Sequence, residues 1–272
     1  MTEIRLLTLE WRVGGDGADD LAERFLAAAE RIDPRALPRR FGRGEPELGA
    51  TAVGRAGRDA FVAGWRQHPF LQGWTGRAPY LEGHVSWSPD RPEPAGMRRQ
   101  VVVHVTVNGS VIAANQDECD RMVHLFTAVA EALPAFFAAG YVERHHGLDQ
   151  HGKAYFMTGS ESHSADWVTG PWWAGLPPKP TWLEWFGAPY AALVADSLAG
   201  QAVEQGTGLL VRHGQLPMDV DEVRPVARRL PDEVIEAFEP VLAEHLSPGV
   251  AGPIVVDWGR SPAPYVPDLT RS

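Results

Sequence analysis

The chain has 272 residues, of which 44% are hydrophobic and 22% are charged, and its formal net charge is −10. This composition is typical of a globular protein, and the length suffices for one large domain or two closely packed halves. The acidic balance disfavours nucleic acid and anionic membranes as partners, whereas it suits a basic protein. The single cysteine, Cys119, excludes an internal disulfide bond.

The N-terminal segment 1–13 carries neither the basic region nor the long apolar run of a secretion signal. Apolar stretches elsewhere also stay shorter than the roughly 18 residues that a membrane-spanning helix needs. We therefore expect a soluble, cytoplasmic protein that does not insert into a membrane.

The first part of the chain predicts a strand followed by a helix. Ile4–Val13 is rich in strand-forming residues, and a glycine-rich turn follows it. Apolar residues then recur at helical spacing over Leu21–Ile32, and the Asp33-Pro34 pair should end this helix. Residues 35–57 are rich in Pro, Gly and Arg and predict a loop, whereas residues 58–66 predict a short helix.

The middle of the chain contains the clearest strand and the clearest helix. Valines at alternate positions over 99–107 predict a strand with one buried face, and 80–87 predicts another strand. Asn108-Gly109 is typical of a tight hairpin turn. An apolar stripe predicts a helix over 117–139, which Pro134 should kink or end.

The remaining elements complete an α+β pattern. Strands are predicted at 141–144, 153–157 and 208–213, and helices at 189–199 and within 220–246. The mixture of adjacent strands and separated helices predicts a mainly antiparallel sheet with packed helices. We assign residues 1–246 to this α+β domain, as one unit or as two packed halves, and residues 247–272 to a tail rich in Pro and Gly.

A segment rich in Trp and Pro, Asp166–Tyr190, stands out from the rest of the chain. It holds five of the ten tryptophans and five prolines, a density of proline that a regular helix or strand does not tolerate. The segment therefore predicts a long, ordered and irregular connection whose indoles are buried against the core. Trp182 and Trp185 are the indoles that we expect to brace it.

Histidines cluster in the motif HHGLDQH and just after it. Imidazole and carboxylate groups are suitable ligands for zinc, but the spacing matches no established zinc pattern, and the neighbouring glycines favour a polar loop. We expect no metal and no other cofactor. If a metal did bind, its ligands would be His145, His146 and His151.

Other constellations of reactive residues are equally weak. Cys119 lies on an apolar helical stripe, where a thiol behaves as a small hydrophobe. Ser160, His163 and Asp166 are the residue types of a catalytic triad, but they crowd into one short segment without a nucleophile motif. His104, on a strand, is better explained as a cross-strand neighbour than as a ligand. We predict no catalytic residue and hence no enzyme.

Three stretches of the chain resemble bacterial immunity proteins. The main one is WWAGLPPKPTWLEWFGAPYAALV at Trp172–Val194, and Leu21–Leu37 and Gly206–Asp221 agree with it. In these stretches the chain is similar to the Imm52 and DUF3396 families of polymorphic toxin systems. The resemblance implies a cytoplasmic α+β protein that binds a cognate toxin. For Imm52-like proteins, it implies a nuclease as the toxin.

The leading hypothesis is therefore an immunity protein that occludes the active site of a basic nuclease toxin. An acidic protein is suited to this, because a site that receives phosphates is usually basic. The predicted partner-binding carboxylates are Glu161, which precedes the Trp/Pro-rich segment, Asp166, which begins it, and Glu184, which lies within it. Two alternatives stay open, namely a metal-dependent hydrolase that uses the His-rich loop and an interaction module unrelated to toxins.

Overall fold

The computed structural model of the protein describes residues 3–14, 20–43, 50–51, 54–67, 72–86, 100–149, 154–156, 180–227, 230–231 and 234. The strands are β1 (Glu3–Gly14), β2 (Arg40–Arg43), β3 (Ala50–Thr51), β4 (Gln72–Thr75), β5 (Tyr80–Ser86), β6 (Gln100–Asn108), β7 (Ala135–Leu148), β8 (Ala154–Phe156), β9 (Leu183–Phe186), β10 (Ala202–Gln205) and β11 (Gly208–Arg212). The helices are α1 (Leu21–Ile32), α2 (Gly54–Gln67), α3 (Gly109–Ala113), α4 (Gln116–Ala132), α5 (Ala188–Val194) and α6 (Val220–Val223), with a short 3-10 helix, η2, at Pro34–Ala36.

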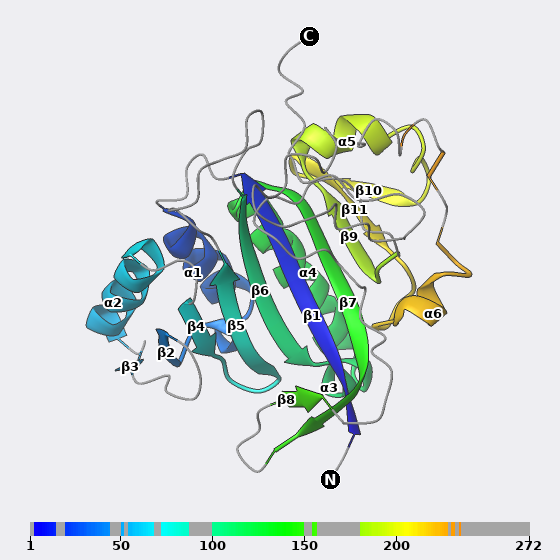
Figure 1. Cartoon of the computed structure of the whole chain (residues 1–272). Coiled ribbons are helices and arrows are strands. Elements are labelled where there is room, and N and C mark those ends of the chain that lie inside the picture. The colour runs from blue at the N-terminus through cyan, green and yellow to red at the C-terminus, as the bar shows by residue number, and fades with distance from the viewer. Residues whose placement is uncertain are drawn as a thin grey trace, which may run out of the picture.

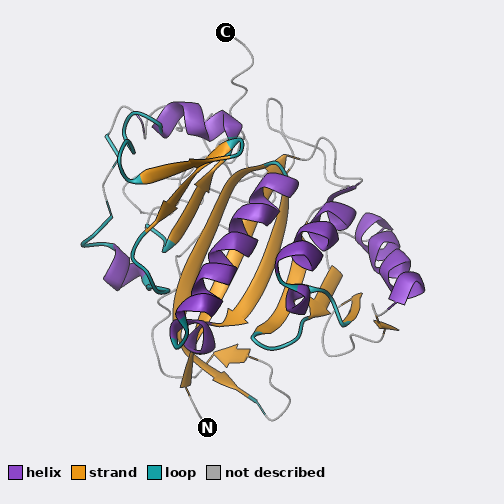
Figure 2. Cartoon of the chain, turned by 180° about the vertical axis from the view of Figure 1, so that it is seen from behind, coloured by secondary structure: helices purple, strands orange, loops and turns teal. Residues whose placement is uncertain are grey.

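The described strands form one sheet of 11 strands, with β8 attached to the side of β7. Its order is β10-β11-β9-β7-β1-β6-β5-β4-β2-β3, and the pairs of neighbouring strands are antiparallel. Helices α1, α2 and α4 lie on one side of this sheet (Figures 1 and 2). The expected α+β class with a mainly antiparallel sheet is confirmed.

Strand β1 lies at the centre of the sheet, between β6 and β7, and its two faces differ in chemistry. Leu7, Leu9, Trp11 and Val13 alternate with polar residues, and Trp11 pairs in register with Val103 of β6. Successive side chains of a strand point to opposite faces, so one face of β1 is apolar. This apolar face contacts α4, where the Trp11 indole Nε1 donates to the Phe126 carbonyl at 2.9 Å.

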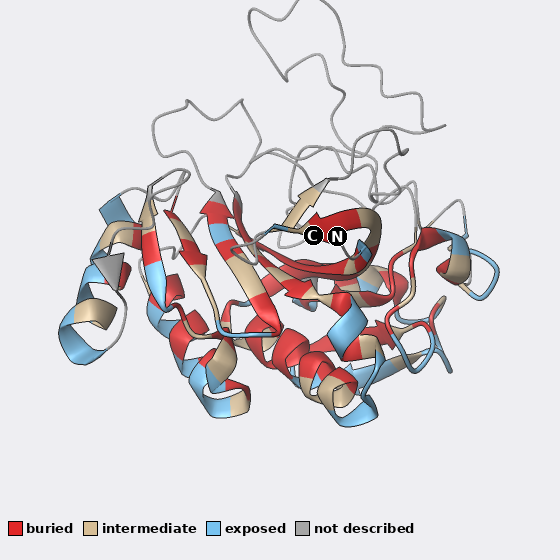
Figure 3. Cartoon of the chain, turned by 90° about the horizontal axis from the view of Figure 1, so that it is seen from below, coloured by how far each residue is buried: buried red, intermediate tan, exposed pale blue. Residues whose placement is uncertain are grey.

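The larger hydrophobic core fills the space between this apolar face and the helices (Figure 3). At one end it contains an aromatic cluster, in which Trp65 of α2 stacks on Trp74 of β4 with ring centroids 5.7 Å apart. A smaller core lies on the other face of β7, β9 and β11, where α5 covers it. Tyr190 of α5 contacts Phe136 and Phe137 there.

The predicted hairpin turn at Asn108-Gly109 and the predicted extension of the long helix to residue 139 were wrong, whereas the helix does end before Pro134 as expected. Asn108-Gly109 does not form a hairpin turn, because the Asn108 side chain accepts a hydrogen bond from Val111 N and caps α3. The long helix begins at Gln116, capped by Asn115, and ends at Ala132, just before Pro134. The predicted residues beyond this proline are part of β7 instead, which begins at Ala135.

The Pro/Gly/Arg-rich stretch 35–57 is also more regular than predicted. It contains η2, β2 and β3, and α2 already begins at Gly54, four residues before the predicted helix start at Arg58. Strands β2 and β3 pair with each other, and β2 also pairs with β4, so they extend the sheet to its far end. Sheet pairing, which the local composition does not reveal, gives this stretch its regularity.

The Trp/Pro-rich segment ends in regular structure. Residues 157–179 are not among those described, but Leu183–Phe186 form β9, which pairs with β7 and β11. The irregular connection that we predicted therefore does not extend to Tyr190. Trp182 and Trp185 are both fully buried in the larger core, and Trp185 Nε1 donates to the Ala135 carbonyl at 3.2 Å. Their predicted role as core braces is confirmed.

Replacing Trp185 with alanine should leave a cavity and an unmatched carbonyl between β9 and β7. We expect the free energy of unfolding to fall by about 3–5 kcal/mol, measured by thermal or denaturant unfolding. Val111→Ala is the matched control, because Val111 is 46% exposed and its truncation should cost less than about 0.5 kcal/mol. An unchanged melting temperature for Trp185→Ala would show that the indole does not support the core.

Candidate functional site

The polar face of β1 carries the most unusual group of side chains in the described structure. Glu10 and Arg12 are each only 1% exposed, and Arg12 Nη2 lies 2.5 Å from Glu10 Oε1. Both Glu10 oxygens are buried and accept no hydrogen bond from a described residue, and within this part of the chain the carboxyl group is held by its ion pair with Arg12. Charged residues are rarely this deeply buried, and their desolvation is costly. This cost makes the buried pair the first candidate for a functional site.

Two histidines continue this polar face toward the solvent. In register, Glu10 lies opposite His104 of β6, and His104 lies opposite His84 of β5. The His104 Nδ1 atom is 3.4 Å from Glu10 Oε2, and the two imidazoles stack with centroids 4.3 Å apart and planes inclined by 13°. His84 is exposed, so the row leads from a buried ion pair to the surface. We call Glu10, Arg12, His104 and His84 the Glu10–His84 row.

The electrostatics of the row favour neutral imidazole. Burial, together with the nearby Arg12 guanidinium, lowers the pKa of His104 to about 3. A base with so low a pKa is poorly matched to proton transfer near neutral pH. Among the described residues, no Ser, Thr or Cys side chain is hydrogen-bonded to either histidine, so the row lacks an adjacent nucleophile. These properties are those of a buried polar cluster that fixes strand register.

The row was missed by sequence reasoning, although His104 itself was correctly interpreted as a cross-strand neighbour. The alternation of Thr8, Glu10 and Arg12 with apolar residues signals a second face of β1 that the core does not accept. That signal predicts solvent exposure for these residues. Their burial depends on what the fold places over the sheet, which the alternation does not show.

Glu143 and two of the predicted metal ligands, His145 and His146, lie in the C-terminal half of β7. Burial raises the pKa of Glu143 to about 7, and its Oε2 is 3.5 Å from His146 Nε2. His145 instead points to Glu3, with Nδ1 3.1 Å from Oε1. The two histidines thus contact different carboxylates, while His151 is not among the described residues. In the described part of the chain, no three His, Cys, Asp or Glu side chains converge as a metal site would require.

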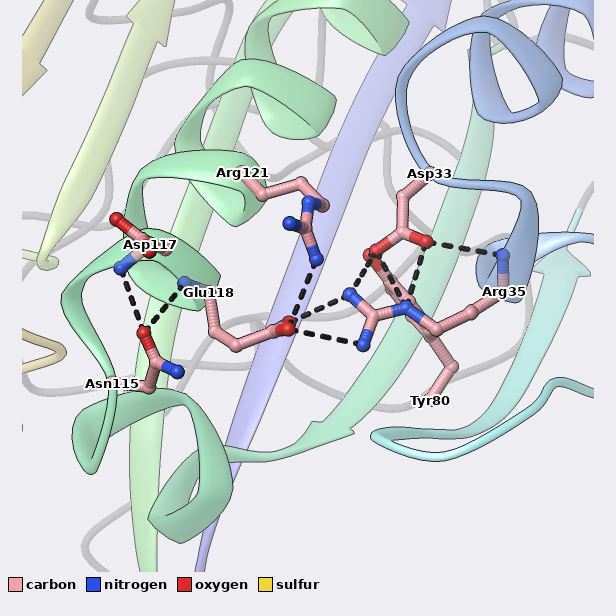
Figure 4. A network of polar contacts seen from close by, with 7 residues as sticks. All are labelled: Asp33, Arg35, Tyr80, Asn115, Asp117, Glu118 and Arg121. Carbon is pink, nitrogen blue, oxygen red and sulfur yellow. Dashed lines mark hydrogen bonds and ion pairs between the residues drawn. The ribbon is translucent and has the colours of Figure 1, made fainter.

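A polar network joins the end of α1 to the start of α4 (Figure 4). Asp33 is only 3% exposed, and its carboxylate accepts hydrogen bonds from Arg35 Nη2 at 2.7 Å and from Tyr80 Oη at 2.9 Å. Arg35 Nη2 also donates to Glu118 Oε2 at 2.6 Å, and the Glu118 carboxylate pairs with Arg121 as well. Burial alone would raise the pKa of Asp33, but the hydrogen bonds outweigh burial and leave it lowered.

A second network anchors α6 to the sheet. Asp219 is 1% exposed and caps α6 in a capping box with Glu222. The same carboxylate accepts hydrogen bonds from Arg5 of β1 at 2.7 Å and from Arg144 of β7 at 2.5 Å. Burial would raise the pKa of Asp219, yet the two guanidinium groups keep it lowered. Each network connects separate elements of the fold. Within each network the carboxylates are bonded to guanidinium groups, so they are engaged in structure and are not placed to act as an acid or a base.

The predicted partner-binding carboxylates are only partly placed. Glu184 lies on β9, where its side chain is 13% exposed; Oε1 accepts from Thr181 N at 3.2 Å, and Oε2 is 3.8 Å from His213 Nε2. Glu184 is thus engaged within the fold and is not a freely exposed rim charge. Glu161 and Asp166 fall outside the described ranges, as do Ser160 and His163 of the weak triad.

Cys119 lies on α4, and its environment is that of an unreactive cysteine. The thiol is buried, its Sγ donates to the Gln215 carbonyl at 3.0 Å, and burial raises its pKa. Helix α4 itself is amphipathic, with acidic residues in its first turn. None of the helices in the described ranges is both long and apolar enough to cross a membrane.

Comparisons with known proteins support the fold but not a family. No family model matches the chain, and no curated protein matches it. Among solved structures, the Pseudomonas aeruginosa T6SS protein PA0821 is similar, with a TM-score of 0.51 and 12% sequence identity. The match covers 86% of this chain and 76% of that one. At this identity the likeness establishes a shared fold, and the Imm52 and DUF3396 resemblance stays a hypothesis.

The network in Figure 4 predicts an unequal response to two arginine substitutions. Arg35→Ala leaves the buried Asp33 carboxylate without its main donor, so the free energy of unfolding should fall by about 1–3 kcal/mol. Arg24→Ala removes a pair with Asp20 in which both side chains are about half exposed, and it should cost less than about 1 kcal/mol. Denaturant unfolding of both variants tests this, and equal losses would contradict a structural role for Asp33.

The buried histidine predicts a pH dependence of stability. The pKa of His104 falls from 6.5 to about 3 on folding, so between these values the unfolded state binds the extra proton. His104 therefore costs stability as the pH falls from about 6.5 toward 3. Glu143 acts in the opposite direction, because its pKa rises from 4.5 to about 7 and the folded state binds the proton there.

The contribution of His104, including its effect on the stacked His84, is measured by comparing the wild type with His104→Gln. Glu143 is present in both proteins, so its contribution cancels in the difference. We expect the stability of the wild type relative to the variant to fall as the pH is lowered from 6.5 to 3.5, measured by urea unfolding. His124→Gln, at an exposed position of α4, is the control and should show no such trend. A pH-independent difference for His104→Gln would contradict the burial of a neutral imidazole.

Proposed function

We propose that the protein is an immunity protein, which binds a cognate bacterial toxin and neutralises it by covering its active site. The observation that carries this proposal is the fold shared with a T6SS protein over 86% of the chain. The sequence resemblance to toxin-system immunity families points the same way, and it rests on different features. We further propose that the toxin is a nuclease, as the Imm52-like resemblance implies.

The physical chemistry of the chain is compatible with such a role. A net charge of −10 attracts a basic partner over long range and raises the rate of association. The ionisable clusters described above are engaged with each other, and occlusion of a toxin needs no catalytic group of its own. We accordingly propose that the protein acts by binding and without chemistry.

The alternatives are separated from this proposal by simple measurements. No described cluster favours a metal-dependent hydrolase, and the absence of a tightly bound metal stays a prediction that elemental analysis tests. An interaction module unrelated to toxins predicts that the neighbouring gene encodes no toxin. The identity of the neighbouring reading frame therefore discriminates between an immunity protein and an interaction module unrelated to toxins.

Co-expression with the product of the adjacent gene tests the proposal directly. We expect that product to arrest growth when it is expressed alone, and we expect this protein to restore growth and to co-purify with it. His84→Ala is the control variant, because His84 is the exposed member of the Glu10–His84 row and substitution there should not disturb the core. Restored growth with His84→Ala would show that the Glu10–His84 row is not needed for protection, whereas no rescue and no complex with the wild type would overturn the assignment for that partner.

A further inference from the structure

The exposed end of the Glu10–His84 row carries two histidines side by side. His84 of β5 and His104 of β6 lie directly opposite each other in the antiparallel register, so both side chains project from the same face of the sheet. This face points away from α4, because Glu10, the register partner of His104 on β1, alternates with the core residue Trp11. The two imidazoles therefore lie where β5, β6 and β1 run side by side, on the face of the sheet opposite to α4 (Figure 1).

Glu10 determines which nitrogen of His104 is available to a ligand. The Glu10 Oε2 atom lies 3.4 Å from His104 Nδ1, and this buried carboxylate favours a proton on Nδ1. A neutral imidazole carries one proton, so the lone pair is then on Nε2. The two nitrogens of an imidazole point in widely different directions, and Nε2 of His104 therefore points away from Glu10. Histidines that bind metals are commonly oriented in this way, by a carboxylate on their other nitrogen.

The two imidazoles are close enough to bind one metal ion together. Their ring centroids are 4.3 Å apart and their planes are inclined by only 13°. A Zn–N bond is about 2.0–2.1 Å long, so two nitrogens on one tetrahedral zinc ion lie about 3.3 Å apart. His84 is exposed, and a small tilt of its ring toward His104 reaches this separation without moving the core.

The electrostatic surroundings leave His104 free of a competing proton. A metal ion binds the neutral imidazole, so protons compete with it for the same nitrogen. The pKa of His104 is lowered to about 3, and no proton has to be displaced near neutral pH. The Arg12 guanidinium, which disfavours any nearby cation, belongs to β1, two strands away from His84, and its charge is offset by Glu10.

We propose that His84 and His104 form a binding site for a divalent transition-metal ion of the kind that imidazole prefers, such as Zn²⁺, with Glu10 orienting His104. Two protein ligands are fewer than the three or four of catalytic and structural zinc sites, so water completes the coordination. The ion accordingly exchanges with the solvent, which is compatible with the prediction that no metal is tightly bound. This site does not depend on the proposed immunity function.

Zinc alone, titrated into the full chain after treatment with a chelator, tests the proposal. Calorimetric titration measures the affinity for Zn²⁺ of the wild type, His84→Ala, His104→Gln and His124→Gln. His124→Gln is the matched control, because His124 is an exposed histidine on α4, outside the row. Melting temperatures are measured first, and His84→Ala, at an exposed position, keeps the test valid if His104→Gln does not fold.

We expect the wild type to bind Zn²⁺, and His84→Ala and His104→Gln to weaken this binding by at least about tenfold, while His124→Gln binds as the wild type does. In NMR spectra of the imidazole nitrogens, Zn²⁺ should shift Nε2 of His104 while Nδ1 stays protonated, which a purely structural pair would not show.

The proposal is overturned if the wild type binds no zinc or if His84→Ala binds zinc equally well. It is also overturned if zinc binding is lost in His146→Ala and kept in His84→Ala, because the ion would then be bound by the HHGLDQH motif.

Discussion

The two-faced character of β1 is the constraint on which the rest of the structure depends. One face carries Trp11 and its apolar neighbours, which form the core with α4, while the other carries Glu10 and Arg12. A shift of one residue in register would exchange the two faces and bury the charged pair among aliphatic side chains. The register with β6 and β7 is therefore specified on both sides of the sheet at once.

The buried Glu10–Arg12 pair illustrates how specificity and stability differ. Burying two charges is costly, and replacing such a pair with apolar residues of similar size often stabilises a protein. Within the described part of the chain, the Glu10 oxygens accept no hydrogen bonds that would offset this cost. We infer that the pair selects the correct alignment of β1 with His104 of β6 more than it adds to the free energy of folding. Asp33 and Asp219 differ from Glu10, because each accepts several hydrogen bonds and thereby ties distant elements together.

Sequence patterns predicted the elements whose signals are local. The alternating valines of β6, the apolar stripe of α4 and the Asp33-Pro34 stop after α1 all correspond to observed elements. Elements that exist through pairing were missed, such as β2 and β3, because their local composition is that of a loop. Asn108 misled for a related reason, since the same side chain suits a turn or a helix cap and only the following chain decides between them. Candidate sites were predicted least well, because the Glu10–His84 row joins residues that are far apart in the sequence.

The central position of β1 also has a consequence for synthesis on the ribosome. This strand is made before its register partners in β6 and β7, which lie about a hundred or more residues later, as the pairing of Leu6 with Asn108 and with Glu143 shows. At about 5–20 residues per second, translation leaves β1 unpaired for several seconds. During that interval its apolar residues are available to the wrong partners, a hazard that a chain built from local hairpins largely avoids.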